Sequence, residues 1–203
     1  MAIISNGTTI ADAGAFQASL GALVHIKTLT ASNSSTLSFV DGSSSVVLDN
    51  TYPIYKFEFL NIHSTNDTVL FQFNMSSDSG SNYNVTKTST YIYASVTESG
   101  GSGQVSYNEN NHLGQSTGFK TLSEAMGSDG DQSGSGYLYL FNPSSTTFVK
   151  NFTGRFNNYH RANLSNDIQT AGYGNTTSAV NGLQFKMNSG NFDGKIKLYG
   201  IKD

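Results

Sequence analysis

The sequence predicts an all-β protein, built as a single antiparallel β-sandwich of the jelly-roll type. Short segments in which apolar and polar residues alternate recur along most of the chain, which is the pattern of strands with one buried face. Turn residues separate these segments, and the connections are too short for crossover helices. About nine or ten such strands in one chain indicate a sandwich.

The first 22 residues form a weakly patterned segment of mostly small side chains. Either a short helix over residues 10–20 or an extended arm fits this segment, and two glycines weaken the helix. An arm laid on a neighbouring subunit would bury its few large apolar side chains. These candidate attachment residues are Ile3, Ile4, Ile10, Phe16 and Leu20. We therefore predict an N-terminal attachment arm, residues 1–22, followed by a β-sandwich domain, residues 23–203.

The strands expected in the first half of the domain follow from the alternation and from its turn residues. The clearest is 53–62, where Tyr55, Phe57 and Phe59 alternate with polar residues. An Asp-Gly pair at 41–42 closes the expected strand 36–40. The expected strands are 23–30, 36–40, a short edge piece at 45–49, 53–62, 68–75 and 88–96.

The amino-acid composition changes at the start of the second half. Residues 97–136 are rich in Gly, Ser and Asp, and we expect flexible tips and exposed loops there. Regular alternation returns at 137–141 and 146–156, and one or two weaker strands are expected within 158–173.

The chain ends in two alternating segments joined by the turn sequence NSGN. A four-residue turn predicts that they pair as a hairpin, with Lys186 opposite Asp193 in solvent. The apolar residues then share one core face, and they are Leu183, Phe185, Met187, Ile196 and Leu198.

The composition excludes several classes of partner. The formal net charge of -3 argues against nucleic acid and anionic membranes. No apolar run approaches the roughly 18 residues of a membrane-spanning helix. Only 12% of residues are charged, and there is no cysteine, which excludes disulfides and thiolate metal sites. The 29 Ser, 20 Thr, 21 Asn and 21 Gly predict a surface covered by hydroxyl and amide groups.

Several segments resemble small β-rich virion structural proteins of tailed bacteriophages, especially marine ones. The closest likeness is in LFNPSSTTF at 140–148 and in LQFKMNSGNFDGKIKLYGIK at 183–202. Further likeness lies in IADAGAF, FEFLNIH, SNYNVTKT and NTTSAVNGLQF, so that it spans nearly the whole chain. These motifs are strands and turns and contain no reactive groups.

The resemblance implies a structural protein on the exterior of the virion. The first hypothesis is a capsid decoration or cement protein that contacts the major capsid protein. The alternative is the receptor-binding tip of a tail fibre or spike, in which the 97–136 loops bind host glycans. Because sandwich edges expose unpaired backbone groups and the chain has few charges to protect them, we also expect a homo-oligomer, trimer first and pentamer second.

No catalytic, cofactor-binding or metal-binding constellation is predicted, and an enzyme is not expected. The four histidines have no metal-ligand spacing. Acidic residues in the irregular middle could supply a carboxylate pair for glycoside hydrolysis, although Gly- and Ser-rich loops position catalytic groups poorly. These residues are Glu98, Glu109, Glu124, Asp129 and Asp131.

Four tyrosines are the one feature with binding potential. They lie among Asn, Ser, Thr and Gly, a mixture that combines aromatic stacking area with adaptable hydrogen bonds, as in carbohydrate sites. The competing and favoured interpretation is that their rings cap the ends of the β-core. The residues are Tyr83, Tyr107, Tyr159 and Tyr173.

Overall fold

The computed structural model describes residues 3–5, 8–12, 15–16, 22–101 and 103–202, and these residues form strands and loops without a helix. In chain order the strands are β1 (Ile3–Ser5), β2 (Thr8–Asp12), β3 (Ala15–Phe16), β4 (Leu23–Ser34), β5 (Thr36–Val40), β6 (Ile54–Ser64), β7 (Phe71–Ser76), β8 (Lys87–Thr97), β9 (Gly103–Tyr107), β10 (Leu113–Ser116), β11 (Lys120–Thr121), β12 (Gly134–Phe141), β13 (Lys150–His160), β14 (Leu164–Gly174), β15 (Gly182–Met187) and β16 (Phe192–Ile201).

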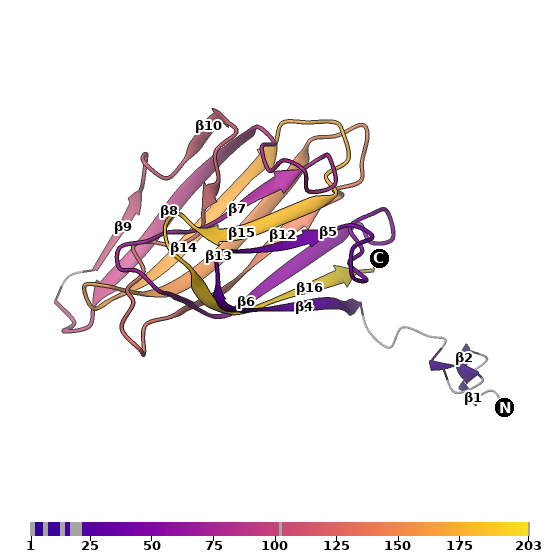
Figure 1. Ribbon diagram of the computed structural model, residues 1–203, viewed down its shortest axis with the longest axis horizontal. Helices are drawn as coiled ribbons and strands as arrows, with labels where there is room; N and C mark the ends of the chain where they lie inside the picture. Colours follow the sequence, from indigo (N-terminus) through magenta and orange to yellow (C-terminus); the bar gives the residue numbers. More distant parts are fainter. Residues whose placement is uncertain (1–2, 6–7, 13–14, 17–21, 102, 203) are drawn as a thin grey trace.

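Two antiparallel sheets pack face to face (Figure 1). The larger sheet has nine strands in the order β10-β8-β14-β13-β12-β6-β16-β4, with β9 also paired to β8. The smaller sheet has the order β11-β7-β15-β5. The predicted all-β antiparallel sandwich is confirmed, and most of its strands lie where the alternation placed them.

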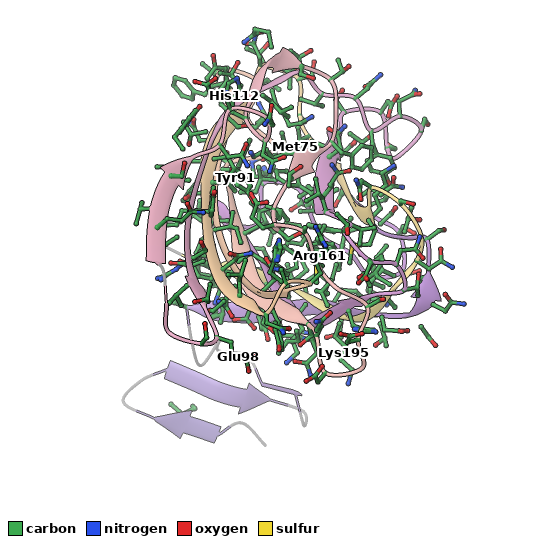
Figure 2. The ribbon with its side chains drawn as sticks, turned by 90° about the vertical axis from the view of Figure 1, so that its left-hand side faces the viewer. Met75, Tyr91, Glu98, His112, Arg161 and Lys195 are labelled. Carbon is green, nitrogen blue, oxygen red and sulfur yellow. The ribbon has the colours of Figure 1, made fainter. Side chains whose placement is uncertain are left out.

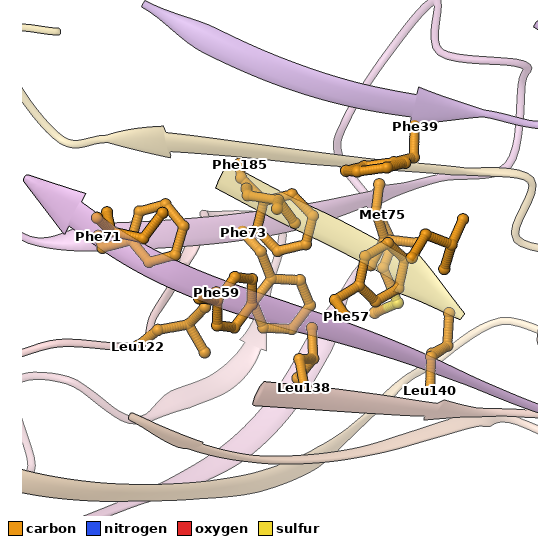
Figure 3. Close-up of a cluster of buried hydrophobic side chains, with 14 of the residues drawn as sticks. Phe39, Phe57, Phe59, Phe71, Phe73, Met75, Leu122, Leu138, Leu140 and Phe185 are labelled. Atoms are coloured by element: carbon orange, nitrogen blue, oxygen red, sulfur yellow. The ribbon is translucent and has the colours of Figure 1, made fainter. Parts of the chain in front are cut away.

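The core between the sheets is built largely from phenylalanine (Figure 3). On β6, Phe57 and Phe59 point inward and are at most 2% exposed. Phe71 and Phe73 of β7 face them from the smaller sheet and are fully buried. The rings of Phe59 and Phe71 meet edge to face with centroids 5.3 Å apart, a geometry that aromatic pairs prefer.

The two terminal strands do not form the predicted hairpin. β15 pairs with β5 and β7 in the smaller sheet, whereas β16 pairs with β4 and β6 in the larger sheet. The NSGN turn therefore carries the chain from one sheet to the other. The predicted core face is nevertheless confirmed, because the apolar sides of the two strands face each other across the core. Each of its members is at most 2% exposed: Leu183, Phe185, Met187, Ile196 and Leu198.

The predicted pair of Lys186 and Asp193 in solvent is consequently wrong. The Lys186 ammonium lies 4.5 Å from the centroid of the Phe119 ring, on the smaller sheet. The Asp193 carboxylate instead accepts a 2.7 Å hydrogen bond from the backbone N–H of Asn33, which has a left-handed backbone with φ of 50°. Asp193 thus supports a strained end of β4 rather than an ion pair.

The N-terminal strands form a sheet of their own. β1 pairs with β2 and β2 pairs with β3, and no other described strand pairs with them. Figure 1 shows β1 and β2 apart from the sandwich. The helical alternative for residues 10–20 is wrong over the described residues, since β2 extends to Asp12 and residues 15–16 form β3.

Two further segments differ from the expectation. Residues 45–49 are a loop and not an edge strand, although Val46 and Leu48 are buried at 4% and 1% exposure. Within 97–136, where loops were expected, the structure has the short strands β9, β10 and β11. On β9, Val105 is 78% exposed, so this strand lacks the buried apolar face that makes a strand visible in a sequence.

Candidate functional site

The outer face of the larger sheet holds a cavity of about 630 Å³. We call it the tyrosine cavity, because two of the four predicted tyrosines line it. Its principal side chains come from β8, β9, the β9–β10 connection, β13 and β14, and they are Thr88, Thr90, Tyr107, His112, Asn151 and Tyr173.

Strand register determines which residues form one side of the tyrosine cavity. Asn151, Tyr173 and Thr88 occupy one row across β13, β14 and β8, so their side chains share a face of the sheet. Next to this row Gly172 cannot be replaced easily. A Cβ atom at position 172 would lie 2.4 Å from the carbonyl oxygen of Thr88, so any other residue there would force β14 and β8 apart.

The other side of the cavity comes from the β9–β10 connection. The rings of Tyr107 and His112 lie with centroids 5.8 Å apart. The turn between them is held by Glu124, whose carboxylate accepts hydrogen bonds from the side-chain amides of Asn108 and Asn111, at 3.1 and 3.2 Å. Glu124 therefore has a positioning role for this wall, which its place in an irregular segment did not predict.

Several polar groups of the tyrosine cavity have no partner in the described part of the chain. The Nδ1 atom of His112 is buried and makes no hydrogen bond. The hydroxyls of Tyr107 and Tyr173 and the side-chain amide of Asn151 likewise have no hydrogen-bonding partner there. Such groups can bind a ligand without first breaking an internal bond.

Tyr159 lines a second cavity, of about 490 Å³, near the other ends of β8, β13 and β14. Its hydroxyl lies 3.2 Å from Glu98 Oε2 and 3.3 Å from Asn163 Oδ1. Burial, followed by the nearby Glu98 charge, raises the pKa of Tyr159. Figure 2 shows Glu98 and His112 at opposite ends of the sandwich, so the two cavities are separate.

Tyr83 belongs to neither cavity. It is half-buried in the loop after β7, and its carbonyl oxygen accepts a 2.5 Å hydrogen bond from the side chain of Asn74. The structure thus brings together Tyr107 and Tyr173, but not the whole predicted set of four.

The acidic residues considered for glycoside hydrolysis are also divided. Glu98 and Asp131 line the second cavity with Tyr159. Glu124 is bound by two asparagine amides, and the Asp129 carboxylate accepts a 3.3 Å hydrogen bond from Gln132. Glu109 is exposed on the connection between β9 and β10.

Three buried lysines are a feature that the sequence interpretation missed. Lys87, Lys120 and Lys150 are each 0% exposed, and no described carboxylate pairs with them. Burial lowers the pKa of Lys87 and of Lys120 from 10.5 to about 7, and it also lowers the pKa of Lys150. A signal was present, because Lys150 is in phase with Phe152 and Lys87 with Tyr91 on the inward side of their strands.

Each buried ammonium group is held by oxygen atoms. Lys87 donates to the side-chain oxygen of Asn74 and, at 2.6 Å, to the carbonyl of Val85. Lys120 donates to the carbonyl of Asn111 at 2.7 Å, and its nitrogen lies 4.8 Å from the centroid of the Tyr91 ring. These contacts are structural and do not line either cavity.

The attachment residues are only partly described. Ile4 is 62% exposed on β1. Ile3, Ile10 and Phe16 lie on β1, β2 and β3, but their side chains fall outside the described part of the structure. Leu20 lies outside the described residues altogether.

Searches of protein-family models, curated proteins and solved structures found no match to this chain. Among the described residues, no group of three or more His, Asp or Glu side chains could hold a metal ion. No helix suited to crossing a membrane occurs within the same residues.

Proposed function

We propose that this protein is a structural component of the exterior of a tailed bacteriophage, a capsid decoration protein with an attachment segment and a displayed body. The observation that carries the proposal is the separation of β1–β3 from the sandwich (Figure 1). The likeness of residues 140–148 and 183–202 to virion structural proteins supports the same role. In the structure these two stretches lie around the β12–β13 turn and in β15 and β16.

A small separate sheet is a reasonable attachment device on energetic grounds. β1, β2 and β3 have three, five and two residues. A sheet this small gains little stability by itself and needs a further surface to cover it. Burial against a capsid protein gains about 25 cal/mol per Å² of apolar area before the costs of association.

Deletion of residues 1–22 tests the attachment role. We expect the remaining protein, which begins at Leu23, the first residue of β4, to keep the melting temperature of the full chain and to lose binding to particles. Co-sedimentation of purified protein with particles that lack it measures the binding. The proposal is wrong if the truncated protein decorates particles as well as the full chain does.

A point variant refines that experiment. Ile4→Asp changes a side chain that is 62% exposed, so we expect weaker particle binding with an unchanged melting temperature. Val105→Asp is the matched control, because Val105 is 78% exposed on β9 of the sandwich. A loss of binding in the Val105 variant alone would place the attachment surface on the sandwich.

We also expect the protein to form a homo-oligomer, trimer before pentamer. β4 is an edge strand of twelve residues that pairs only with β16 among the described strands. It contains no proline and a single lysine, Lys27, so it has few of the features that protect an edge strand from pairing. Sedimentation at micromolar concentration measures the mass in solution, and a monomer there contradicts the expectation.

The tyrosine cavity favours a second candidate, a receptor-binding tip of a tail fibre or spike. Electron microscopy of labelled protein on the virion distinguishes the two, because a decoration protein covers the head whereas a fibre tip is confined to the tail.

A further inference from the structure

We infer that the tyrosine cavity binds a neutral saccharide, of about the size of one or two sugar rings. The inference concerns the isolated chain and does not depend on where the protein sits on a particle. A volume of about 630 Å³ lies within the range of small-molecule sites, which is roughly 300–1,000 Å³.

Two tyrosine rings provide apolar surface for the faces of a sugar. Tyr107 is 48% exposed and lies beside the His112 ring, and Tyr173 lies half-buried on β14 within the same cavity. Tyrosine combines a rigid apolar ring with a polar hydroxyl, and it orders at low entropic cost. The two rings come from strands on either side of β8, and both line the same cavity.

The polar groups of the cavity match hydroxyl groups rather than ions. The hydroxyls of Tyr107 and Tyr173 and the side-chain amide of Asn151 have no hydrogen-bonding partner in the described part of the chain, and these groups can both donate and accept. Sugar hydroxyls also donate and accept, so one ligand can satisfy these three side chains.

The uncharged lining of the tyrosine cavity disfavours ionic ligands. Among the residues that the structure describes, no Asp, Glu, Lys or Arg lines the tyrosine cavity. A carboxylate, phosphate or ammonium group would therefore lose hydration there without gaining an ion pair. The second cavity differs, because Glu98 and Asp131 line it and the Tyr159 hydroxyl is already within hydrogen-bond distance of Glu98.

Glycan-array screening followed by calorimetry on the full-length protein tests the inference. The panel contains the neutral hexoses, the N-acetylhexosamines and their disaccharides, together with sialic and uronic acids. We expect binding to at least one neutral saccharide and a preference for it over the acidic sugars. Tyr107→Ala and Tyr173→Ala should each weaken that binding about tenfold or more, because a central aromatic contact is lost.

Two further variants keep the result interpretable. Asn151→Ala alters an exposed side chain with little risk to folding, and it should also weaken binding. Tyr159→Ala is the matched control, since it removes the tyrosine of the second cavity and should leave affinity unchanged. The inference is overturned if no neutral saccharide binds at millimolar concentration, if acidic sugars are preferred, or if Tyr159→Ala reduces the affinity while the Tyr107 and Asn151 variants do not.

Discussion

Replacing Phe185 with alanine is expected to lower the free energy of unfolding by about 3–5 kcal/mol, through lost burial and a residual cavity. Phe185 is fully buried on β15, between the two sheets (Figure 3). Its ring lies 5.3 Å from the rings of both Phe57 and Phe59 on the facing sheet, and 6.0 Å from the ring of Phe71 on its own sheet. The loss is a large fraction of the total stability of a domain, which is roughly 5–15 kcal/mol. Urea denaturation at equilibrium measures it.

Gln184→Ala is the matched control at the neighbouring position. Gln184 points to the other face of β15, where its amide donates a 3.0 Å hydrogen bond to the hydroxyl of Ser38. Removing one half-exposed neutral hydrogen bond costs about 1 kcal/mol. If Gln184→Ala proves more damaging than Phe185→Ala, the two faces of β15 are exchanged and the register is wrong.

The burial of most strands could be predicted because alternation is a local property. On β6, Phe57 and Phe59 alternate with Lys56 and Glu58, and the structure buries the two rings while Lys56 and Glu58 form a 2.6 Å ion pair on the outer face. This alternation can be recognised in the sequence without knowing which strand lies beside it. β9 and β10 are the counterexample, since neither has a buried apolar face and both were predicted to be loops.

The pairing of strands could not be predicted from the same pattern. The NSGN turn between β15 and β16 suits either a hairpin or a crossing between sheets, because both place the apolar residues on one buried side. What decides between them is the presence of β5 and β7 beside β15, and of β4 and β6 beside β16. These partners lie more than 100 residues away in the sequence.

The tyrosine cavity illustrates the same limit at the candidate site. The composition around Tyr107 and Tyr173 indicated binding potential, but the two residues are brought together by the pairing of β8 with β9 and with β14. The buried lysines are different. The phase of Lys87 along β8 and of Lys150 along β13 is visible in the sequence, but lysine is so rarely buried without a partner that phase alone does not predict its burial.

The free energy of unfolding is expected to rise with pH between about pH 7 and pH 10, because Lys87 and Lys120 lose their protons in the folded state near pH 7. In the unfolded chain the same lysines keep their protons up to the ordinary pKa of 10.5. The unfolded state therefore binds more protons throughout this window, and deprotonation favours the folded state. Each lysine contributes at most about 1.4 kcal/mol per pH unit.

Neither of the two lysines forms an ion pair with a carboxylate in the described part of the chain. Lys87 contacts Asn74 from β7, and across the sheet Gly174 separates it from Lys150, a like charge that is itself buried. Lys120 faces the Tyr91 ring, and the nearby Glu124 charge contributes to raising the pKa of Tyr91. Desolvation is accordingly the cause of both lowered lysine pKa values.

Buried tyrosines set the upper limit of the effect. Burial raises the pKa of both Tyr55 and Tyr91 above the ordinary value of 10. Above that pH the unfolded tyrosines lose their protons while the folded ones keep them, so the free energy of unfolding falls again. We therefore expect stability to be greatest near pH 10, which is well above the usual range of about pH 5–8.

Urea denaturation at several pH values from about 7 to 9.5 tests this expectation, with Lys87→Met and Lys120→Met as variants. The quantity compared is the slope of unfolding free energy against pH, because removing the Lys87 ammonium also takes a donor from Asn74, which keeps the Met75 N–H, and from the carbonyl of Val85, and so changes the absolute stability. Each variant should lose the part of this slope that the replaced lysine contributes. Lys195→Met, which changes an exposed lysine on β16, should keep the full slope. A wild-type protein whose stability is flat or falls between pH 7 and 9 would show that both buried lysines stay charged, held by their oxygen contacts despite desolvation.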